Sequence, residues 1–299
     1  MSSGPRVDAA IRAQLVEAGL DPVAIERLVA VALDEDLDGG VDVTTVATVP
    51  VEQRATLDLV ARAPGVVAGI PVAAAVFSHV GGQSVRIIQA RPDGSAVDAG
   101  DVLLSATGPT HVLLQAERPA LNLLCHLSGI ATATARWVDA VSGTSARVRD
   151  TRKTTPGMRR LEKYAVRCGG GVNHRMSLSD AALVKDNHVV AAGGVAAAFD
   201  AVRQRFPGID VEVEVDSLDQ LDDVLAAGAD LVLLDNFTVD DMRVAVHRTA
   251  GRARLEASGG LSLDVAAEVA GTGVDYLAVG ALTHSAPVLD IGADLRQED

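Results

Sequence analysis

A repeating alternation of short apolar strands and amphipathic helices in the second half of the chain restricts the possible folds most strongly. The expected strands begin near Arg147, Leu183, Val211, Leu231, Arg254 and Tyr276. Three of the later helices follow typical N-cap residues, which are Ser217, Thr238 and Ser262. Strands that alternate with helices form parallel sheets covered by helices. The repeat therefore predicts an incomplete parallel α/β barrel of six to seven strands, with an open doubly wound sheet as the alternative.

The first part of the chain has a different pattern. Asp21 and Pro22 predict a helix start, and residues 54–106 alternate short apolar runs with turn signals that predict antiparallel strands. The pattern becomes helical from about Thr110, with a second helix expected from Ile130. We therefore predict an α/β sandwich domain over residues 1–127 and a barrel domain over residues 128–287. The tail, residues 288–299, is expected to pack with the first domain.

One apolar stretch, residues 63–80, has no charged residue and resembles a membrane span in composition. Prolines, glycines and a histidine interrupt it, so we interpret it as sheet and turn and expect no membrane association. The two cysteines, Cys125 and Cys168, lack a CxxC spacing, and no secretory signal is recognisable at the N-terminus. We expect neither a disulfide framework nor a zinc knuckle. These features are typical of a cytoplasmic protein.

The charge distribution indicates a site for an anion. The formal net charge is -14, which argues against nucleic acid as a partner. Residues 147–175 nevertheless hold nine Lys or Arg against two acids. All three lysines of the chain, Lys153, Lys163 and Lys185, lie within residues 147–188. A local reversal of charge favours binding of an anion, and a solvated basic face is the alternative.

The strand VEVEVD, residues 211–216, places its three carboxylates on one face and its valines on the other. If the valines face the helices, the carboxylates face the barrel interior, where they need cations such as Arg147, Arg149 and Lys185. For Glu212 we favour an internal ion pair over a functional role.

Charged residues and glycines recur at the carboxyl ends of the expected strands, where barrel enzymes carry their active sites. They are Arg152, Lys153, Lys185, Glu214, Asp235, Ser258, Gly259, Gly260 and Gly280. Arginine and lysine in this set suit a multiply anionic substrate. Glu214 and Asp235 are suitable ligands for Mg²⁺ bound to phosphates. The glycines allow backbone N–H groups to approach a phosphate, or serve turn geometry alone.

Several segments resemble those of the quinolinate phosphoribosyltransferases, which are also called nicotinate-nucleotide pyrophosphorylases (carboxylating). The resemblance covers nearly the whole chain in the same order. Its segments are ERPALNLLCHLSGIAT (117–132), DTRKTTPGMRRLEKYAVRCGGGVNHR (150–175), VKDNH (184–188), EVEVD (212–216), LLDNF (233–237), EASGG (256–260) and VGALTHS (279–285). The DTRKT and GGGxNHR motifs are the most specific of these. Membership of a type II phosphoribosyltransferase family is thus the expectation.

The resemblance implies a reaction and a fold. Quinolinate and phosphoribosyl pyrophosphate, with Mg²⁺, give nicotinate mononucleotide, pyrophosphate and CO₂ in NAD synthesis. The implied fold is an N-terminal open-faced sandwich with a C-terminal α/β barrel, paired head to tail in a homodimer, with a higher homo-oligomer left open.

The resemblance also implies roles for residues. Arg152, His174, Arg175 and Lys185 match positions that hold the quinolinate carboxylates, and the neighbouring subunit contributes Arg118. Lys153, Glu214 and Asp235 match positions near the phosphoribosyl donor and its metal, and Ser258, Gly259 and Gly280 match the phosphate cradle. Pro119 departs from what a helix interior favours, because proline removes a hydrogen bond and kinks the turn that presents Arg118.

Three alternatives stay open on the residues alone. A nicotinate-type phosphoribosyltransferase needs fewer cations, because its substrate has one carboxylate. A barrel aldolase uses a Schiff-base lysine, for which Lys185 is the candidate. A non-catalytic binding protein on the same scaffold is the third, and the metal-type carboxylates and phosphate-type glycines argue against it.

Overall fold

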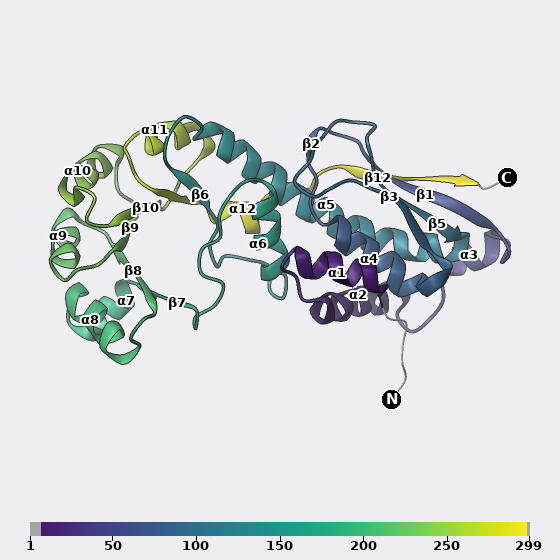
Figure 1. The fold of residues 1–299 in the computed structure, drawn as a ribbon, viewed down its shortest axis with the longest axis horizontal. Coiled ribbons are helices and arrows are strands. Elements are labelled where there is room, and N and C mark those ends of the chain that lie inside the picture. Colours follow the sequence, from purple (N-terminus) through teal and green to yellow (C-terminus); the bar gives the residue numbers. More distant parts are fainter. Residues whose placement is uncertain (1–6, 298–299) are drawn as a thin grey trace. The chain divides into compact units, whose positions relative to one another are not determined.

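The computed structural model describes residues 7–297 as two compact units (Figure 1). One unit contains the chain up to Ala133, Arg160–Gly169 and the chain from Ala286 onward. The other contains Thr134–Arg159 and Gly170–Ser285. Both units mix helices with sheet.

The first unit is built on a four-stranded antiparallel sheet. Its strands, in the order β12-β1-β5-β3, are Ile291–Gln297, Arg54–Ala61, Val102–Pro109 and Arg86–Ala90. The C-terminal strand β12 therefore lies beside β1. A two-stranded ribbon of β2(Gly65–Val66) and β4(Ala96–Val97) accompanies the sheet, as does the short helix η1(Gly82–Ser84). Residues 55–61 of β1 are all buried.

Helices cover one face of this sheet. Helix α4(Ile70–Gly81) packs on β3 and β5 and also on α1(Ala9–Glu17) and α2(Pro22–Leu37). Its residues Ile70 and Val72 to Ser78 are all buried, with Phe77 fully enclosed. The helix α3(Val43–Thr48) precedes β1. Helix α4, between the sheet and two further helices, forms part of the apolar core of this unit, to which buried residues of the long helix that follows β5 also contribute.

The prediction of sheet and turn for residues 63–80 was wrong over its second half. Helix α4 begins after Gly69, whose φ of 102° is in the left-handed region, and Pro71 occupies the first turn. Proline is tolerated there because the first helical N–H groups have no partner within the helix. The Asp93 carboxylate instead accepts hydrogen bonds from the backbone N–H groups of Gly69 and Ile70, at 2.9 and 3.0 Å. The cap is supplied from a distant loop, so no local signal marks the helix start.

Helix α5(Thr110–Ala140) is a single helix, where the sequence predicted two. Pro119 lies inside it and does not end it. The chain of this helix passes from the first unit to the second at Ala133. Helix α2 begins at Pro22 with Asp21 as its N-cap, as predicted, and continues to Leu37. Among residues 7–297, none of the helices combines the length and apolar character needed to cross a membrane.

The second unit is a parallel α/β structure. Its strands are β6(Arg147–Arg149), β7(Ala181–Val184), β8(Asp210–Val215), β9(Leu231–Asp235), β10(Arg254–Ser258) and β11(Tyr276–Ala278). Its helices are α7(Asp186–Ala192), α8(Val195–Arg205), α9(Leu218–Ala226), α10(Val239–Thr249), η2(Leu263–Val265), α11(Ala266–Ala270) and α12(Ala281–His284). Helix α6(Arg159–Cys168) follows β6 and groups with the first unit from Arg160 onward.

The strand order identifies this unit as an incomplete barrel. The order is β6-β11-β10-β9-β8-β7, and every pairing is parallel. A doubly wound sheet places its first strand in the interior and reverses direction there. Here the first strand, β6, pairs with the last strand, β11, as in a barrel. The predicted barrel is confirmed, and the alternative of an open doubly wound sheet is excluded.

The barrel is open between β6 and β7. An isolated parallel bridge joins Arg149 to Val172 and places the segment before His174 along the free edge of β6. Helices α8, α9, α10 and α11 lie on the outer side of the curved sheet (Figure 1). The side chains that alternate with the buried valines of β8 therefore face the interior of the curved sheet.

Candidate active site

A cavity of about 340 Å³ lies at the carboxyl ends of the barrel strands. Its lining residues come from β7 to β11 and from the loops that follow β6. They are Thr151, Arg152, Lys153, His174, Arg175, Leu183, Lys185, Glu214, Leu233, Asp235, Glu256, Ser258, Gly259 and Ala278. Parallel strands of one barrel end at the same rim, so residues distant in sequence meet there.

Nine of the eleven predicted site residues line this cavity, and Arg118 and Gly280 do not. Gly280 lies beside it, because a Cβ atom added there would be 2.9 Å from the Lys153 Cδ atom. Arg118 lies on α5 in the other unit, with 62% of its side chain exposed and Glu117 at 3.9 Å.

Glu256 is a buried charged residue of the cavity lining that was not predicted from the sequence. Strand β10 alternates Arg254, Glu256 and Ser258 with buried apolar residues. The same period-two argument that was applied to β8 places Glu256 on the inner face. The signal was thus present in the sequence.

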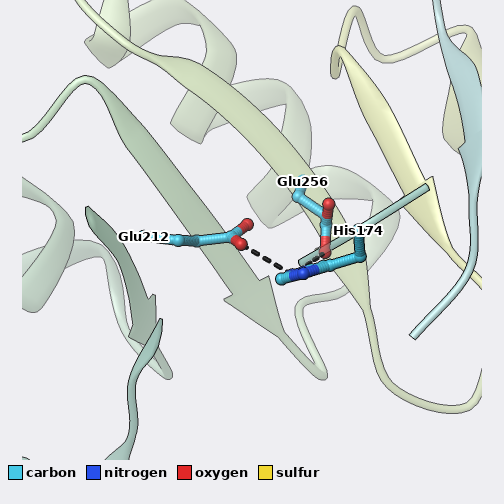
Figure 2. A group of neighbouring side chains, drawn as sticks. All are labelled: His174, Glu212 and Glu256. Atoms are coloured by element: carbon cyan, nitrogen blue, oxygen red, sulfur yellow. Dashed lines mark ion pairs between the residues drawn. The ribbon is translucent and has the colours of Figure 1, made fainter. Parts of the chain in front are cut away.

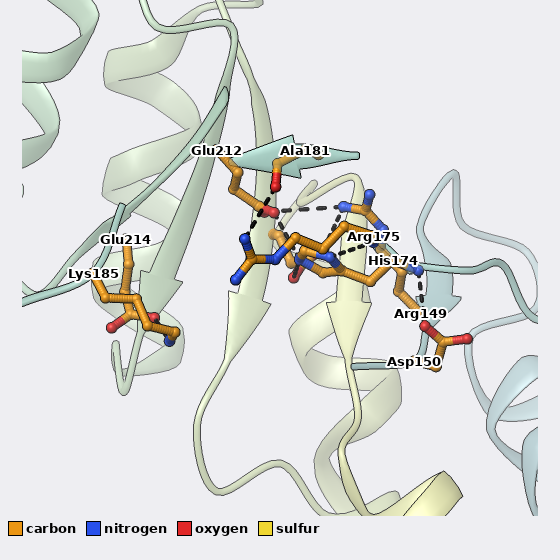
Figure 3. A network of polar contacts seen from close by, with 9 residues as sticks. Arg149, Asp150, His174, Arg175, Ala181, Lys185, Glu212 and Glu214 are labelled. Atoms are coloured by element: carbon orange, nitrogen blue, oxygen red, sulfur yellow. Dashed lines mark hydrogen bonds and ion pairs between the residues drawn. The ribbon is translucent and has the colours of Figure 1, made fainter. Parts of the chain in front are cut away.

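Two arginines give the cavity an excess of positive charge. Burial, and then the neighbouring charge of Arg152, lower the pKa of Arg175 below its ordinary value. The Arg175 guanidinium donates a hydrogen bond to the Ala181 carbonyl at 3.0 Å (Figure 3). The Nε atom of Arg152 is buried and has no hydrogen-bond partner among residues 7–297. Like charges this close favour an anionic ligand between them.

Lys185 forms an ion pair with Glu214 at the rim of the cavity (Figure 3). The Glu214 side chain is 14% exposed, whereas that of Lys185 is 45% exposed. The predicted pairing of a β8 carboxylate with Lys185 is therefore present. An ion-paired ammonium is a poor nucleophile, which disfavours the Schiff-base alternative.

A buried ion-pair network adjoins the cavity, and Figure 2 shows three of its side chains, His174, Glu212 and Glu256. The Arg149 guanidinium is 2.7 Å from Glu256 Oε2 and 3.9 Å from Glu212 Oε1. The His174 Nε2 atom is 2.7 Å from Glu212 Oε2 and 3.6 Å from Glu256 Oε1. Burial, followed by the charge of Glu212, raises the pKa of Glu256. The internal ion pair favoured for Glu212 is present, with Arg149 as its arginine partner.

The glycine at the end of β10 has a steric requirement. Gly259 has a φ of 91°, and a Cβ atom there would lie 2.2 Å from Asn236 Oδ1. The backbone N–H of Asn236 donates to the Ser258 carbonyl at 3.0 Å. Turn geometry and close packing thus account for this glycine without a phosphate, whereas Gly280 leaves space for the Lys153 side chain.

Glu214 and Asp235 both line the cavity. The Asp235 Oδ2 atom accepts a hydrogen bond from the Asn236 side-chain amide at 2.8 Å. One or two carboxylates with substrate oxygens suit Mg²⁺, which rarely uses a complete set of protein ligands. The residues present fit that metal.

Two family models together cover most of the chain. The model of the quinolinate phosphoribosyl transferase N-terminal domain matches residues 42–128, and that of the C-terminal domain matches residues 130–294. The chain belongs to this family. The predicted family is thereby confirmed on both parts of the chain.

Relatives with established names are similar over nearly their whole length. A nicotinate-nucleotide pyrophosphorylase [carboxylating] of Mycobacterium leprae is 57% identical over 268 residues, covering 88% of this chain and 94% of the relative. The Homo sapiens enzyme of the same name is 41% identical, covering 92% and 93%. The crystal structure of NadC from Streptococcus pyogenes superposes with a TM-score of 0.89 at 41% identity, covering 94% of this chain and 99% of that one. The family fold, a sandwich with an α/β barrel, extends to this chain.

Proposed function

We propose that this chain is a nicotinate-nucleotide pyrophosphorylase (carboxylating). It converts quinolinate and phosphoribosyl pyrophosphate to nicotinate mononucleotide, pyrophosphate and CO₂, a step of de novo NAD synthesis. The names of the relatives support this activity. The observation that carries it is the cavity at the barrel rim, which combines Arg152 and Arg175 with Glu214 and Asp235.

The cations of the cavity match a substrate with two carboxylates. Arg152 and Arg175 repel each other in the free protein, and a dianion between them removes that repulsion. Arginine binds carboxylates through two parallel hydrogen bonds, which also orients the pyridine ring. A nicotinate-type substrate has one carboxylate and leaves more of this charge without a partner.

The chemistry needs no covalent intermediate with the protein. The lone pair of the quinolinate ring nitrogen forms a bond to C1 of the ribose as the bond to pyrophosphate breaks. Positive charge develops on the ribose in that step, and Glu214 and Asp235 are the carboxylates available to stabilise it. The pyridinium then accepts the electron pair of the C2–carboxylate bond as CO₂ leaves, and a proton from solvent replaces the carboxylate.

Further assignments belong to the proposal. Glu214 and Asp235 hold Mg²⁺, which neutralises charge on the phosphates of the donor when it is bound. Lys153 contacts the donor, with Ser258, Gly259 and Gly280 around its phosphate, while Lys185 binds on the quinolinate side, which His174 also lines. The protein acts in the cytoplasm as a homodimer, in which Arg118 of one subunit serves the site of its partner. The exposure of Arg118 leaves it available for that role.

The decisive experiment supplies purified protein with phosphoribosyl pyrophosphate, Mg²⁺ and either quinolinate or nicotinate. The expected result is nicotinate mononucleotide and CO₂ in equal amounts from carboxyl-labelled quinolinate, with little product from nicotinate. Turnover of nicotinate without turnover of quinolinate contradicts the proposal and favours the nicotinate-type alternative. Borohydride trapping of Lys185 by a carbonyl substrate supports the aldolase instead.

A further inference from the structure

His174 contacts the buried network with one ring nitrogen and its own backbone neighbour with the other. Its Nδ1 atom accepts a hydrogen bond from the backbone N–H of Arg175 at 2.6 Å. A backbone N–H can only donate, so the Nδ1 atom carries no proton. The ring proton therefore resides on Nε2, which is 2.7 Å from Glu212 Oε2 and donates to it. The hydrogen bonds thus define a neutral ring with a single tautomer.

This tautomer changes the role expected for His174. As a neutral ring with both nitrogens engaged, it adds no positive charge to the cavity that it lines. The ring also does not suit a metal ion. Its Nε2 atom and the two nearby glutamates have ligand atoms within 4.8 Å of one another. A metal on Nε2 would require a proton on Nδ1, which would then face the N–H of Arg175.

Two hydrogen bonds of His174 help to hold the turn that carries Arg175. The His174 backbone N–H donates to Asp150 Oδ1 at 2.8 Å, and the His174 ring accepts from the Arg175 N–H. Glu212 is 3% exposed and lies on strand β8, which is hydrogen-bonded on both sides, to β7 and to β9. A continuous chain of hydrogen bonds therefore connects a barrel strand with the backbone of a cavity arginine (Figure 3).

We propose that Glu212 is a positioning residue: it holds His174 in the neutral Nε2–H tautomer and thereby fixes the Arg175 backbone and guanidinium for the substrate carboxylate. The inference rests on the proposed function for its kinetic consequence, but the tautomer is independent of activity. Without Glu212 the buried Nε2–H loses its acceptor at 2.7 Å, and Glu256 Oε1 lies 3.6 Å from Nε2. The ring therefore gains by rotating toward another acceptor and away from Arg175. The binding of quinolinate then weakens, while the donor side of the cavity is unaffected.

The first test observes the tautomer directly. Nitrogen-15 NMR of histidine-labelled protein distinguishes a protonated ring nitrogen from a bare one. The His174→Asn variant identifies the signals of His174, because they disappear from its spectrum. We expect these signals to show a protonated Nε2 and an unprotonated Nδ1 at neutral pH. Glu256→Gln is the matched control, since Glu256 Oε1 is 3.6 Å from Nε2 and makes no hydrogen bond to it. It leaves this signature unchanged. A proton on both nitrogens, or on Nδ1 alone, overturns the proposal whatever the enzyme does.

The second test uses substitutions of Glu212. Glu212→Met keeps the side-chain length and removes the acceptor, whereas Glu212→Gln retains a carbonyl oxygen that can accept from Nε2–H. The expected result is a rise of roughly 5- to 150-fold in the KM for quinolinate in the Met variant, the range that corresponds to an unsatisfied buried donor. The KM for phosphoribosyl pyrophosphate stays constant, and the Gln variant recovers most of the loss. An equal loss for both substrates, or no recovery with Gln, refutes the positioning role. If wild-type protein has no quinolinate turnover, the proposed function fails, and the NMR result still decides the tautomer.

Discussion

Removal of the Arg152 guanidinium tests the proposal that two neighbouring arginines of the cavity bind a dianionic substrate. Arg152→Gln keeps most of the side-chain length and removes one of two neighbouring cations. In the free protein this relieves the repulsion that lowers the pKa of Arg175. We therefore expect the variant to be at least as stable as the wild type. Binding of a dianion, by contrast, loses a charge-assisted contact in a partly desolvated site.

The magnitude follows from the loss of one charged partner. Truncation of one member of a desolvated, hydrogen-bonded charge pair costs about 2 to 5 kcal/mol, or roughly 30- to 5,000-fold in affinity. Arg152 is partly buried, and its Nε atom is inaccessible to solvent. We expect the dissociation constant for quinolinate to rise within that range. The dissociation constant for phosphoribosyl pyrophosphate is expected to change by less than about threefold, well below 1 kcal/mol.

Isothermal titration calorimetry measures both constants, and thermal unfolding measures stability. Arg147→Gln is the matched control. Arg147 is exposed on β6 and does not line the cavity, so its substitution removes the same charge outside the site. The reasoning is refuted if Arg152→Gln binds quinolinate within about threefold of wild type. It is also refuted if Arg147→Gln weakens binding equally, because the effect would then come from the general field of the protein.

Three further predictions concern titration and the metal. Burial raises the pKa of Asp93, so its contribution to the free energy of unfolding is fully present below the unfolded pKa near 4 and is lost as pH rises through the folded pKa. In urea unfolding at pH 4 to 8, Asp93→Asn should flatten this decline in stability. An unchanged slope of stability against pH would contradict the assignment. Burial raises the pKa of Cys168 to about 11, so at pH 8 its thiolate fraction is about 100-fold below that of a thiol with a pKa of 9. Its reaction with a disulfide reagent should be correspondingly slow. Reaction at the rate of a free thiol would contradict the buried position of Cys168. Chelation should abolish turnover, excess Mg²⁺ should restore it, and Asp235→Asn should raise the Mg²⁺ concentration required, whereas full activity in chelator would remove the metal from the proposal.

Local sequence patterns predicted the barrel correctly because its strands and helices are encoded locally. Period-two alternation in β8 placed Glu212 and Glu214 on the inner face, where Arg149 and Lys185 are their cation partners. The N-caps at Ser217 and Thr238 also accept hydrogen bonds in the first turn of their helices. These features depend on residues fewer than about ten positions apart, and burial in the barrel reinforces the same pattern.

Helix α4 could not be predicted in this way. Its residues are buried on nearly all sides, so the sequence lacks the alternation of apolar and polar faces that marks a surface helix. The Gly69 and Pro71 that open it are also typical of turns. Its cap comes from Asp93, 24 residues from Gly69. Only the packing of that loop against the helix start distinguishes helix from turn.

The residue types at the strand ends were sufficient to predict an anion site at the rim of an α/β barrel, because parallel strands bring their carboxyl ends together in any such fold. The sequence could not show whether His174 adds positive charge to the site as the arginines do, because the protonation of an imidazole depends on its two hydrogen-bond partners. The backbone of Arg175 and the carboxylate of Glu212 occupy those positions. Glu212 follows His174 by 38 positions in the sequence. The tautomer of His174 is therefore a property of the tertiary fold.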